Sequence, residues 1–269
     1  MYYIDIFFLI ILAVAGLCVG SFLNVIIYRL PREQSIIKPR SFCPKCGHKI
    51  KAYENIPVFS YIFLRGKCSE CKEKISVRYP IVEIITAVLW VLPLILLPSY
   101  TAIDIANIVI AALFSTVLLA IFIIDFEHLI IPNELVISII VLSIPAFFTQ
   151  NDLIVWYEKL IGFAVGGGIL YLLAYLSEKF LKKEGVGGGD IKLMAACGLV
   201  LGWQNILLSL FVAAIITMIV ILLVMTPIKK KLPIGEIVPF APALSAAMVI
   251  CLYYGEDIIF WYLTSIMGL

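Results

Sequence analysis

Long apolar segments dominate this sequence and restrict the folds that it can adopt. A helix needs about 20 largely apolar residues to cross a bilayer, and eight segments are candidates. They are residues 6–28, 80–97, 103–124, 130–148, 160–176, 191–201, 206–225 and 237–254. Hydrophobic residues make up 63% of the chain and charged residues 14%, whereas a soluble domain is about half apolar and about a quarter charged. The sequence therefore predicts an all-α polytopic membrane protein with about eight transmembrane helices.

Positive charge is concentrated in one segment between the first two apolar stretches. Twelve of the twenty Lys and Arg residues lie in residues 29–78, and none lies in residues 79–158. Short loops rich in Lys and Arg stay in the cytoplasm, so we expect this loop inside and the N-terminus outside. Alternating spans then place two lysine clusters inside, and Lys159 outside as the one exception. The clusters are Lys179, Lys182 and Lys183, and residues 229–231.

These features divide the chain into three predicted parts. Residues 1–28 form the first transmembrane helix, residues 29–79 a small cytoplasmic loop domain, and residues 80–269 the remaining membrane domain. We find no internal repeat. The basic loop carries twelve positive residues against four acids, which attraction to anionic membrane lipid explains sufficiently. Because the loop is small and tethered to the membrane, we expect no nucleic-acid partner.

Four of the seven cysteines lie in the basic loop as two Cys-x-x-Cys pairs. They are Cys43, Cys46, Cys68 and Cys71, and 21 residues separate the pairs. This pattern is typical of a structural zinc site, in which four thiolates complete a tetrahedron. The reducing cytoplasm disfavours disulfides, and Gly47 suits the turn after the second thiolate. The alternatives are unmetallated thiol pairs or a redox switch, and His48 is either a substitute ligand or a surface residue.

The remaining cysteines stand singly in apolar runs. They are Cys18, Cys197 and Cys251. An isolated buried cysteine behaves as a small apolar side chain, so we interpret these three as packing residues.

Two aspartates are the candidate catalytic residues. Asp125 ends the third span and Asp190 begins the sixth, so the alternating topology brings both to the cytoplasmic face although 65 positions separate them. Two carboxyl groups about 3 Å apart share one proton, so that one activates a water and the other protonates a peptide carbonyl. Such a pair titrates as a unit, so neither residue is assigned as the base.

A glycine run precedes Asp190. Gly187, Gly188 and Gly189 lack a Cβ atom, which permits sharp turns and close approach of another backbone. A protease needs its substrate extended beside the catalytic group, so we predict that these glycines lie along the bound peptide.

Other interpretations of the aspartates stay open at this point. Each could be an ordinary solvated boundary residue, and Asp190 also suits a helix N-cap. A membrane scaffold or transporter is a second class, although such proteins carry acids in mid-span. A presenilin-like protease is a third, but its aspartates lie deeper and it lacks a zinc loop.

Several motifs, in order along nearly the whole chain, resemble those of the type IV prepilin peptidases. The matching stretches are 20–25 with Tyr28-Arg29-Leu30-Pro31, the loop from Cys43 to Glu83, Asp125 to Asn133, and residues 187–193, followed by Gly198 and 201–203. Glu54, Asn133 and Ala241 depart from the family pattern, and none of these departures touches the aspartates or cysteines.

This resemblance implies a function. The family's enzymes are membrane aspartyl proteases that remove a short basic leader, after a glycine, from prepilins or pseudopilins of pilus or type II secretion systems. The resemblance also implies that the chain lies in the bacterial inner membrane, with the active site and the zinc loop at the cytoplasmic side. Members with the tetracysteine loop tend also to methylate the new N-terminus with S-adenosylmethionine. The sequence contains no glycine-rich cofactor turn, so no residue is assigned to the methyl donor.

Overall fold

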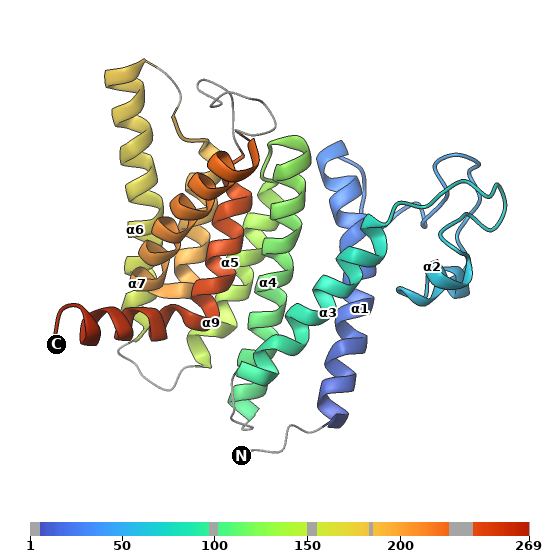
Figure 1. The fold of residues 1–269 in the computed structure, drawn as a ribbon, viewed down its shortest axis with the longest axis horizontal. Helices are drawn as coiled ribbons and strands as arrows, with labels where there is room; N and C mark the ends of the chain where they lie inside the picture. The colour runs from blue at the N-terminus through green and yellow to red at the C-terminus, as the bar shows by residue number, and fades with distance from the viewer. Residues whose placement is uncertain (1–5, 97–101, 150–154, 183–184, 226–238, 269) are drawn as a thin grey trace. The chain divides into compact units, whose positions relative to one another are not determined.

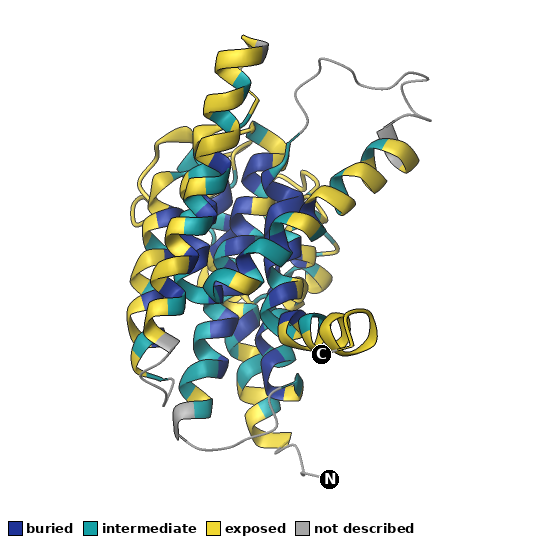
Figure 2. Cartoon of the chain, turned by 90° about the vertical axis from the view of Figure 1, so that its left-hand side faces the viewer, coloured by how far each residue is buried: buried dark blue, intermediate teal, exposed yellow. Residues whose placement is uncertain are grey.

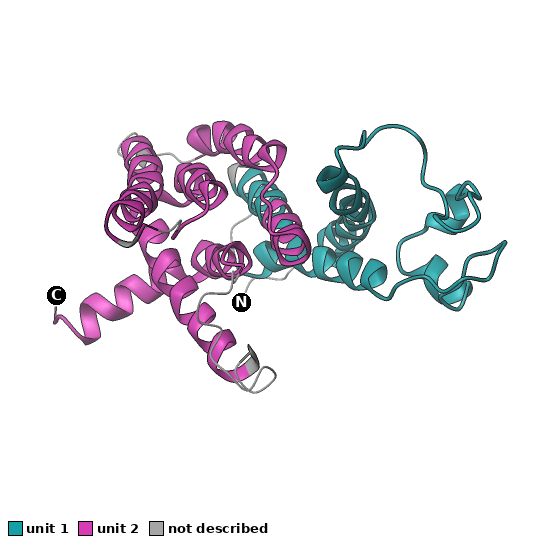
Figure 3. Ribbon diagram, turned by 90° about the horizontal axis from the view of Figure 1, so that it is seen from above, with its two compact units in different colours: residues 1–116 teal, residues 117–269 magenta. Residues whose placement is uncertain are grey.

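The computed structural model describes residues 6–96, 102–149, 155–182, 185–225 and 239–268. Among these residues the secondary structure is helical, and β pairing is limited to two isolated bridges in the cysteine loop. The chain divides into two compact units, Met1–Thr116 and Val117–Leu269, coloured separately in Figure 3. The predicted all-α class is therefore confirmed. The three-part division of the chain stays a prediction.

Seven long helices account for most of the described chain (Figure 1). They are α1 (Ile6–Arg29), α3 (Arg78–Leu96), α4 (Ala102–His128), α5 (Asn133–Phe148), α6 (Val155–Leu176), α7 (Gly188–Val220) and α9 (Ala241–Ser265). Among the described residues, six helices are long and apolar enough to cross a membrane, and α5 is a shorter apolar helix. The loop after α1 contains only short helical turns, including α2 (Phe59–Phe63).

The α7 helix reverses direction at Gly202. This residue has φ 77° and ψ 174°, a non-helical conformation that glycine adopts at little cost. A Cβ on Gly166 of α6 would lie 2.6 Å from the Met194 carbonyl oxygen and 3.2 Å from the Ile206 Cγ1. Met194 and Ile206 therefore lie side by side, whereas a straight helix would separate them by about 18 Å. The predicted spans 191–201 and 206–225 are thus two helices folded back on each other, which agrees with the predicted count.

Glycines allow neighbouring helices to pack backbone against backbone. A Cβ on Gly162 of α6 would overlap the carbonyl oxygen of Gly198 of α7, and the reverse also holds. In the first unit, a Cβ on Gly16 of α1 would lie 2.6 Å from the Cα of Ala87 in α3. Small residues make such contacts because association inside a membrane depends on close packing rather than on exclusion of water.

Exposed residues cover large parts of the helix surfaces (Figure 2), and many of them are large and apolar. Phe148 is 81% exposed and Tyr171 is 65% exposed. In a membrane these faces contact lipid tails, which are as apolar as the side chains, so their exposure is expected.

Lys159, the exception in the charge distribution, is buried rather than exposed to solvent. Its side chain is 3% exposed, and its Nζ donates a hydrogen bond to the Ala146 carbonyl oxygen at 2.7 Å. Ala146 lies in the last turn of α5, where carbonyl groups lack helical partners and a positive charge is favourable. The lysine therefore caps α5. The clusters at Lys183 and residues 229–231 lie outside the described residues.

Two of the three single cysteines are packing residues, as predicted. Cys197 and Cys251 are buried. The prediction is wrong for Cys18, which is exposed on α1, because an apolar membrane helix has a lipid-facing side that composition alone does not identify.

Candidate functional site

Asp125 lies on the buried face of α4, one turn before the helix ends. It follows Phe114, Leu118 and Ile121 at steps of three and four residues, and all three have no exposed surface. Asp125 itself is 7% exposed. The helix ends after His128, where the backbone of Leu129 turns left-handed at φ 56°. The same helical periodicity that packs α4 therefore carries a carboxyl group into the protein interior.

The first residue of α9 contacts the Asp125 carboxyl group. The Ala241 backbone N–H donates a hydrogen bond to it. Because the first N–H groups of a helix have no partners inside the helix, they are free to bind a carboxylate, and the helix dipole adds to the attraction. Ala241 was not among the site residues predicted from the sequence. Pro242, inside the first turn of α9, was the available signal of a helix start.

Asp190 lies in the first turn of α7 and is partly buried. The N-cap of α7 is Gly187, so the interpretation of Asp190 as the N-cap residue is wrong. Asp190 is the third helical residue, and its carboxyl group accepts a hydrogen bond from the Gly187 backbone N–H. This is the backward bond of a capping box, which fixes the side chain beside the start of its own helix.

These two carboxyl groups lie near enough for the charge of one to act on the other. The Asp125 and Asp190 side chains interact electrostatically, although 65 positions separate them in the sequence. One comes from the last turn of α4 and the other from the first turn of α7. Two like charges held in a partly desolvated place resist joint ionisation, so the arrangement suits a pair that shares a proton.

The three glycines before Asp190 have different surroundings. A Cβ on Gly187 would lie 3.2 Å from the Asp190 Oδ2, and one on Gly189 would lie 3.2 Å from side-chain carbons of Ile131. Gly188 is exposed, and a Cβ there would meet no atom within 4 Å. A side chain at Gly187 or Gly189 would therefore be crowded by Asp190 or Ile131, whereas one at Gly188 would have open space.

Lys192 is bonded to a residue that sequence reasoning did not place in the site. Its Nζ donates a hydrogen bond to Asn133 Oδ1 at 3.2 Å, which joins the start of α7 to the start of α5. Asn133 had drawn notice only as a departure from the family pattern. Lys192 lies two positions after Asp190 in α7, so the bond holds its ammonium group near the start of that helix.

The four loop cysteines converge on one point. The sulfur atoms of Cys43, Cys46, Cys68 and Cys71 all lie within 4.8 Å of one another, and the Cys43 and Cys71 sulfurs are 3.9 Å apart. Four thiolates bound to a central zinc at 2.3 Å would be about 3.8 Å from each other. The predicted cluster is confirmed as a group that fits a tetrahedral metal ion.

Both cysteine pairs have the same backbone geometry. The Gly47 N–H donates to the Cys43 carbonyl at 2.9 Å, and the Lys72 N–H donates to the Cys68 carbonyl at 3.2 Å. Gly47 and Lys72 are left-handed, with φ of 72° and 58°. An isolated bridge flanks each pair, Phe42 with Lys49 and Lys67 with Lys74. The two Cys-x-x-Cys pairs predicted from the sequence therefore lie in turns of the same backbone shape.

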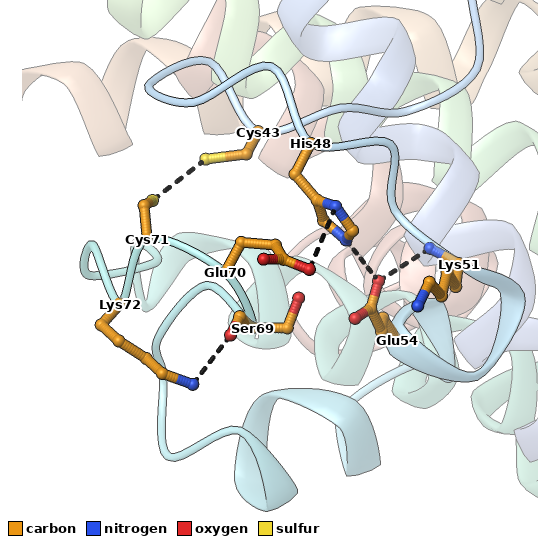
Figure 4. A network of polar contacts seen from close by, with 8 residues as sticks. All are labelled: Cys43, His48, Lys51, Glu54, Ser69, Glu70, Cys71 and Lys72. Atoms are coloured by element: carbon orange, nitrogen blue, oxygen red, sulfur yellow. Dashed lines mark hydrogen bonds and ion pairs between the residues drawn. The ribbon is translucent and has the colours of Figure 1, made fainter.

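His48 connects the two cysteine turns without entering the sulfur cluster (Figure 4). Its Nε2 is 3.1 Å from Glu54 Oε2, and its Nδ1 is 3.8 Å from Glu70 Oε1. The Lys51 backbone N–H also donates to Glu54 at 2.8 Å. This bond is the main reason why the pKa of Glu54 is lowered to about 2, with the Ser69 hydroxyl and His48 adding to it. Glu54 is therefore ionised at neutral pH.

The cysteines of the cluster differ in their pKa values. The pKa of Cys43 is lowered to about 7, chiefly by the Cys46 backbone N–H, and backbone N–H groups also lower the pKa of Cys68. The pKa of Cys71 is raised to about 11, because the Glu73 backbone N–H, which lowers it, is outweighed by burial and by the neighbouring thiols. Metal ligands must be thiolates, so the turns prepare Cys43 and Cys68, but not Cys71, for a metal ion.

Comparison with known proteins finds two family models and several relatives that match this chain. The Bacterial Peptidase A24 N-terminal domain matches residues 14–97, and the Type IV leader peptidase family matches residues 112–222. A prepilin leader peptidase/N-methyltransferase of Aeromonas salmonicida is 33% identical, over 94% of this chain and 92% of its own length. Its namesake in Pseudomonas aeruginosa is 35% identical over 92% and 91%. No solved structure matches the chain.

The two family models match different parts of the chain, and each part contains one of the two candidate sites. The first contains the four cysteines, and the second contains both aspartates. Relatives with the same name extend to Neisseria gonorrhoeae, at 31% identity over 94% of this chain. The chain therefore belongs to the type IV leader peptidase family.

Proposed function

We propose that this protein is a membrane aspartyl endopeptidase that removes the N-terminal leader from prepilins or pseudopilins. The observation that supports the proposal is the electrostatic interaction between Asp125 and Asp190, two carboxyl groups that come from separate helix ends. The family match and the names of the relatives identify prepilins as the substrate class.

The chemistry is the addition of water to a peptide bond. One carboxylate takes a proton from the water, whose oxygen attacks the peptide carbonyl, while the partner carboxylic acid protonates the carbonyl oxygen. The acid formed in this step then protonates the amide nitrogen while the other carboxylate takes a hydroxyl proton from the tetrahedral intermediate. The carbon–nitrogen bond breaks, so that the leader leaves with a new carboxyl group and the mature chain with a new amine. No covalent intermediate with the enzyme forms.

Backbone donors keep the two carboxyl groups in place during this cycle. Asp125 is held by the Ala241 N–H and Asp190 by the Gly187 N–H. Because these donors belong to helix starts, they do not need to reorganise as charge moves between the aspartates. Gly188, with its open surroundings, is the position where an extended substrate can lie closest to the backbone.

The four cysteines hold a zinc ion, which we propose to be structural. Four thiolates leave no open coordination position for substrate or water. The ion would join the turn at residues 43–48 to the turn at residues 68–73, a task that the His48 contacts to Glu54 and Glu70 support. It fixes the shape of the loop and takes no part in peptide cleavage.

We propose two further properties, one from the charge of the loop and one from the relatives' names. The positive charge of residues 29–78 favours a cytoplasmic loop, and thus an active site at the cytoplasmic face of the bacterial inner membrane. The relatives' names include N-methyltransferase, and we propose a second activity that transfers a methyl group from S-adenosylmethionine to the amine released by cleavage.

Cleavage of a purified substrate tests the proposal. The protein is reconstituted in lipid with a full-length prepilin, with and without S-adenosylmethionine, and the products are identified by intact mass. We expect loss of the leader in both reactions and one added methyl group only with S-adenosylmethionine. A prepilin that stays intact with a folded, zinc-loaded protein contradicts the peptidase assignment, and an unmethylated product contradicts the second activity.

A further inference from the structure

A cavity of about 310 Å³ lies between α1 and the loop that follows it, in the first unit. Five of its lining residues come from α1, between Cys18 and Arg29, and the others come from residues 36–57 of the loop. The cavity therefore follows the loop-side half of α1 for about 16 Å at 1.5 Å per residue. Two arginines, Arg29 and Arg40, are among the lining residues, which include no Asp or Glu.

Arg29 brings a buried positive charge to this cavity without a counter-charge. It is 7% exposed, its Nη1 donates to the Ser35 carbonyl at 2.9 Å, and its Nη2 donates to the Pro39 carbonyl at 2.7 Å. These bonds fasten the loop to the end of α1, but both acceptors are neutral, and the helix end offers only a partial negative charge. In the described part of the chain no carboxylate forms an ion pair with Arg29. A buried charge is costly without an opposite charge, so this site favours an anion.

The loop adds further donors at the same end of the cavity. Arg40 follows Pro39, whose carbonyl Arg29 binds, and its exposed side chain lines the cavity with those of Ser41 and Asn55. Residues 29–41 carry four basic residues and one acid. Guanidinium, hydroxyl and amide groups all donate hydrogen bonds, and arginine suits the several oxygens of a phosphate group. Beside a membrane helix, the phosphate at hand is that of a lipid.

An apolar stripe leads along α1 to this cationic end. Phe22 is 51% exposed and Val14 is 54% exposed. The opposite face of α1 packs on α3, where a Cβ on Gly16 would lie 2.6 Å from the Ala87 Cα. The stripe therefore points away from α3, and an acyl chain can lie along it. Its members recur at steps of three and four residues and are Ile11, Val14, Cys18, Phe22 and Val25.

We infer that this cavity binds the headgroup of one anionic phospholipid. Its phosphate lies at Arg29 and Arg40, and its acyl chains run along the apolar stripe, because the cavity is too small for a whole phospholipid. The lipid supplies the negative charge that Arg29 lacks and fixes the cysteine-bearing loop at the end of α1. The inference does not depend on the proposed peptidase function.

Lipid binding to the full-length, zinc-loaded protein tests this inference. Native mass spectrometry in detergent measures its affinity for phosphatidylglycerol, which is anionic, and for phosphatidylcholine, which has no net charge. One positive charge beside an anionic headgroup is worth about fivefold in affinity. We therefore expect Arg40→Gln to weaken phosphatidylglycerol binding about fivefold and phosphatidylcholine binding much less. Arg40 is chosen because Arg29 also fastens the loop.

Arg65→Gln is the matched control, since Arg65 is an exposed arginine of the same loop that does not line the cavity. It should weaken phosphatidylglycerol binding less than about twofold, because the charge that it removes lies outside the proposed site. Equal weakening by the two variants would show a diffuse attraction to charge and overturn the inference. Equal affinity of the unaltered protein for the two lipids would overturn it as well.

A phosphatidylglycerol with a photoactivatable acyl chain locates the bound lipid. We expect adducts on the apolar stripe of α1, at residues 11–25, with a lower yield in Arg40→Gln and an unchanged yield in Arg65→Gln. Excess inorganic phosphate at constant ionic strength should leave the adducts in place, because it lacks the acyl chains. Adducts on other helices only, or their displacement by inorganic phosphate, would contradict a lipid site in this cavity.

Discussion

Replacing Asp125 or Asp190 with asparagine should lower leader removal at least about 100-fold, since each change removes a group that handles protons in the transition state. Asparagine keeps the size of the side chain, and its amide oxygen can still accept from the Ala241 or Gly187 N–H. The variants should therefore accumulate and unfold like the unaltered protein. Initial rates of prepilin cleavage in lipid, normalised to folded protein, measure the effect.

Glu134→Gln provides the control for the aspartate variants. Glu134 is an exposed acid in the first turn of α5. Like the two aspartates, it lies near a helix end. Its replacement should leave the rate within about twofold, because it donates or accepts no proton in the reaction. The double variant Asp125→Asn/Asp190→Asn should be about as inactive as either single variant, since residues that act as a unit have non-additive effects. Substantial cleavage by either single variant would refute the pair.

Loss of the metal should produce the second large effect. We expect about one zinc ion per chain in the unaltered protein, and almost none in Cys68→Ser, because a tetrahedral site that loses a thiolate binds zinc far more weakly. Cys68 is the buried member of the cluster, so its replacement should also loosen the loop and make its backbone accessible to protease. Elemental analysis gives the zinc content, and limited proteolysis of residues 29–79 reports the loosened loop.

Cys18→Ser is the matched control for the metal prediction. Cys18 is an exposed cysteine on α1 outside the sulfur cluster. Its replacement should leave both the zinc content and the proteolysis pattern unchanged. A fully active, well-folded preparation of unaltered protein that contains no zinc would contradict a structural role for the ion.

The sequence was sufficient for features that depend on residue type and spacing. Runs of apolar residues predicted the helices, because crossing a membrane requires them. The spacing of Cys43, Cys46, Cys68 and Cys71 predicted a cluster that fits a metal, since few other arrangements use two Cys-x-x-Cys pairs. The alternation of spans predicted that Asp125 and Asp190 would lie at one membrane face. In the structure the charge of Asp125 acts on the Asp190 carboxyl group, and their catalytic role stays a prediction.

Features that depend on backbone geometry could not be predicted. Gly202 reverses the chain, but in the sequence it is one glycine within an apolar run. The Ala241 N–H binds Asp125 through the backbone, which any residue type except proline could provide at that position. Lys159 looked like an exception to the charge rule, because that rule counts charges and takes no account of a lysine buried against a helix end.

Chemical cross-linking of the two aspartate positions tests the central claim most directly. In the double variant Asp125→Cys/Asp190→Cys, a bifunctional thiol reagent with a short spacer should join the two positions, as peptide mass mapping can detect. Asp125→Cys/Asp257→Cys is the control pair, because Asp257 lies on α9 sixteen residues beyond Ala241. The account predicts a bridge in the first pair and none in the control. Two thiols that react with the reagent independently in both pairs would contradict a shared catalytic centre.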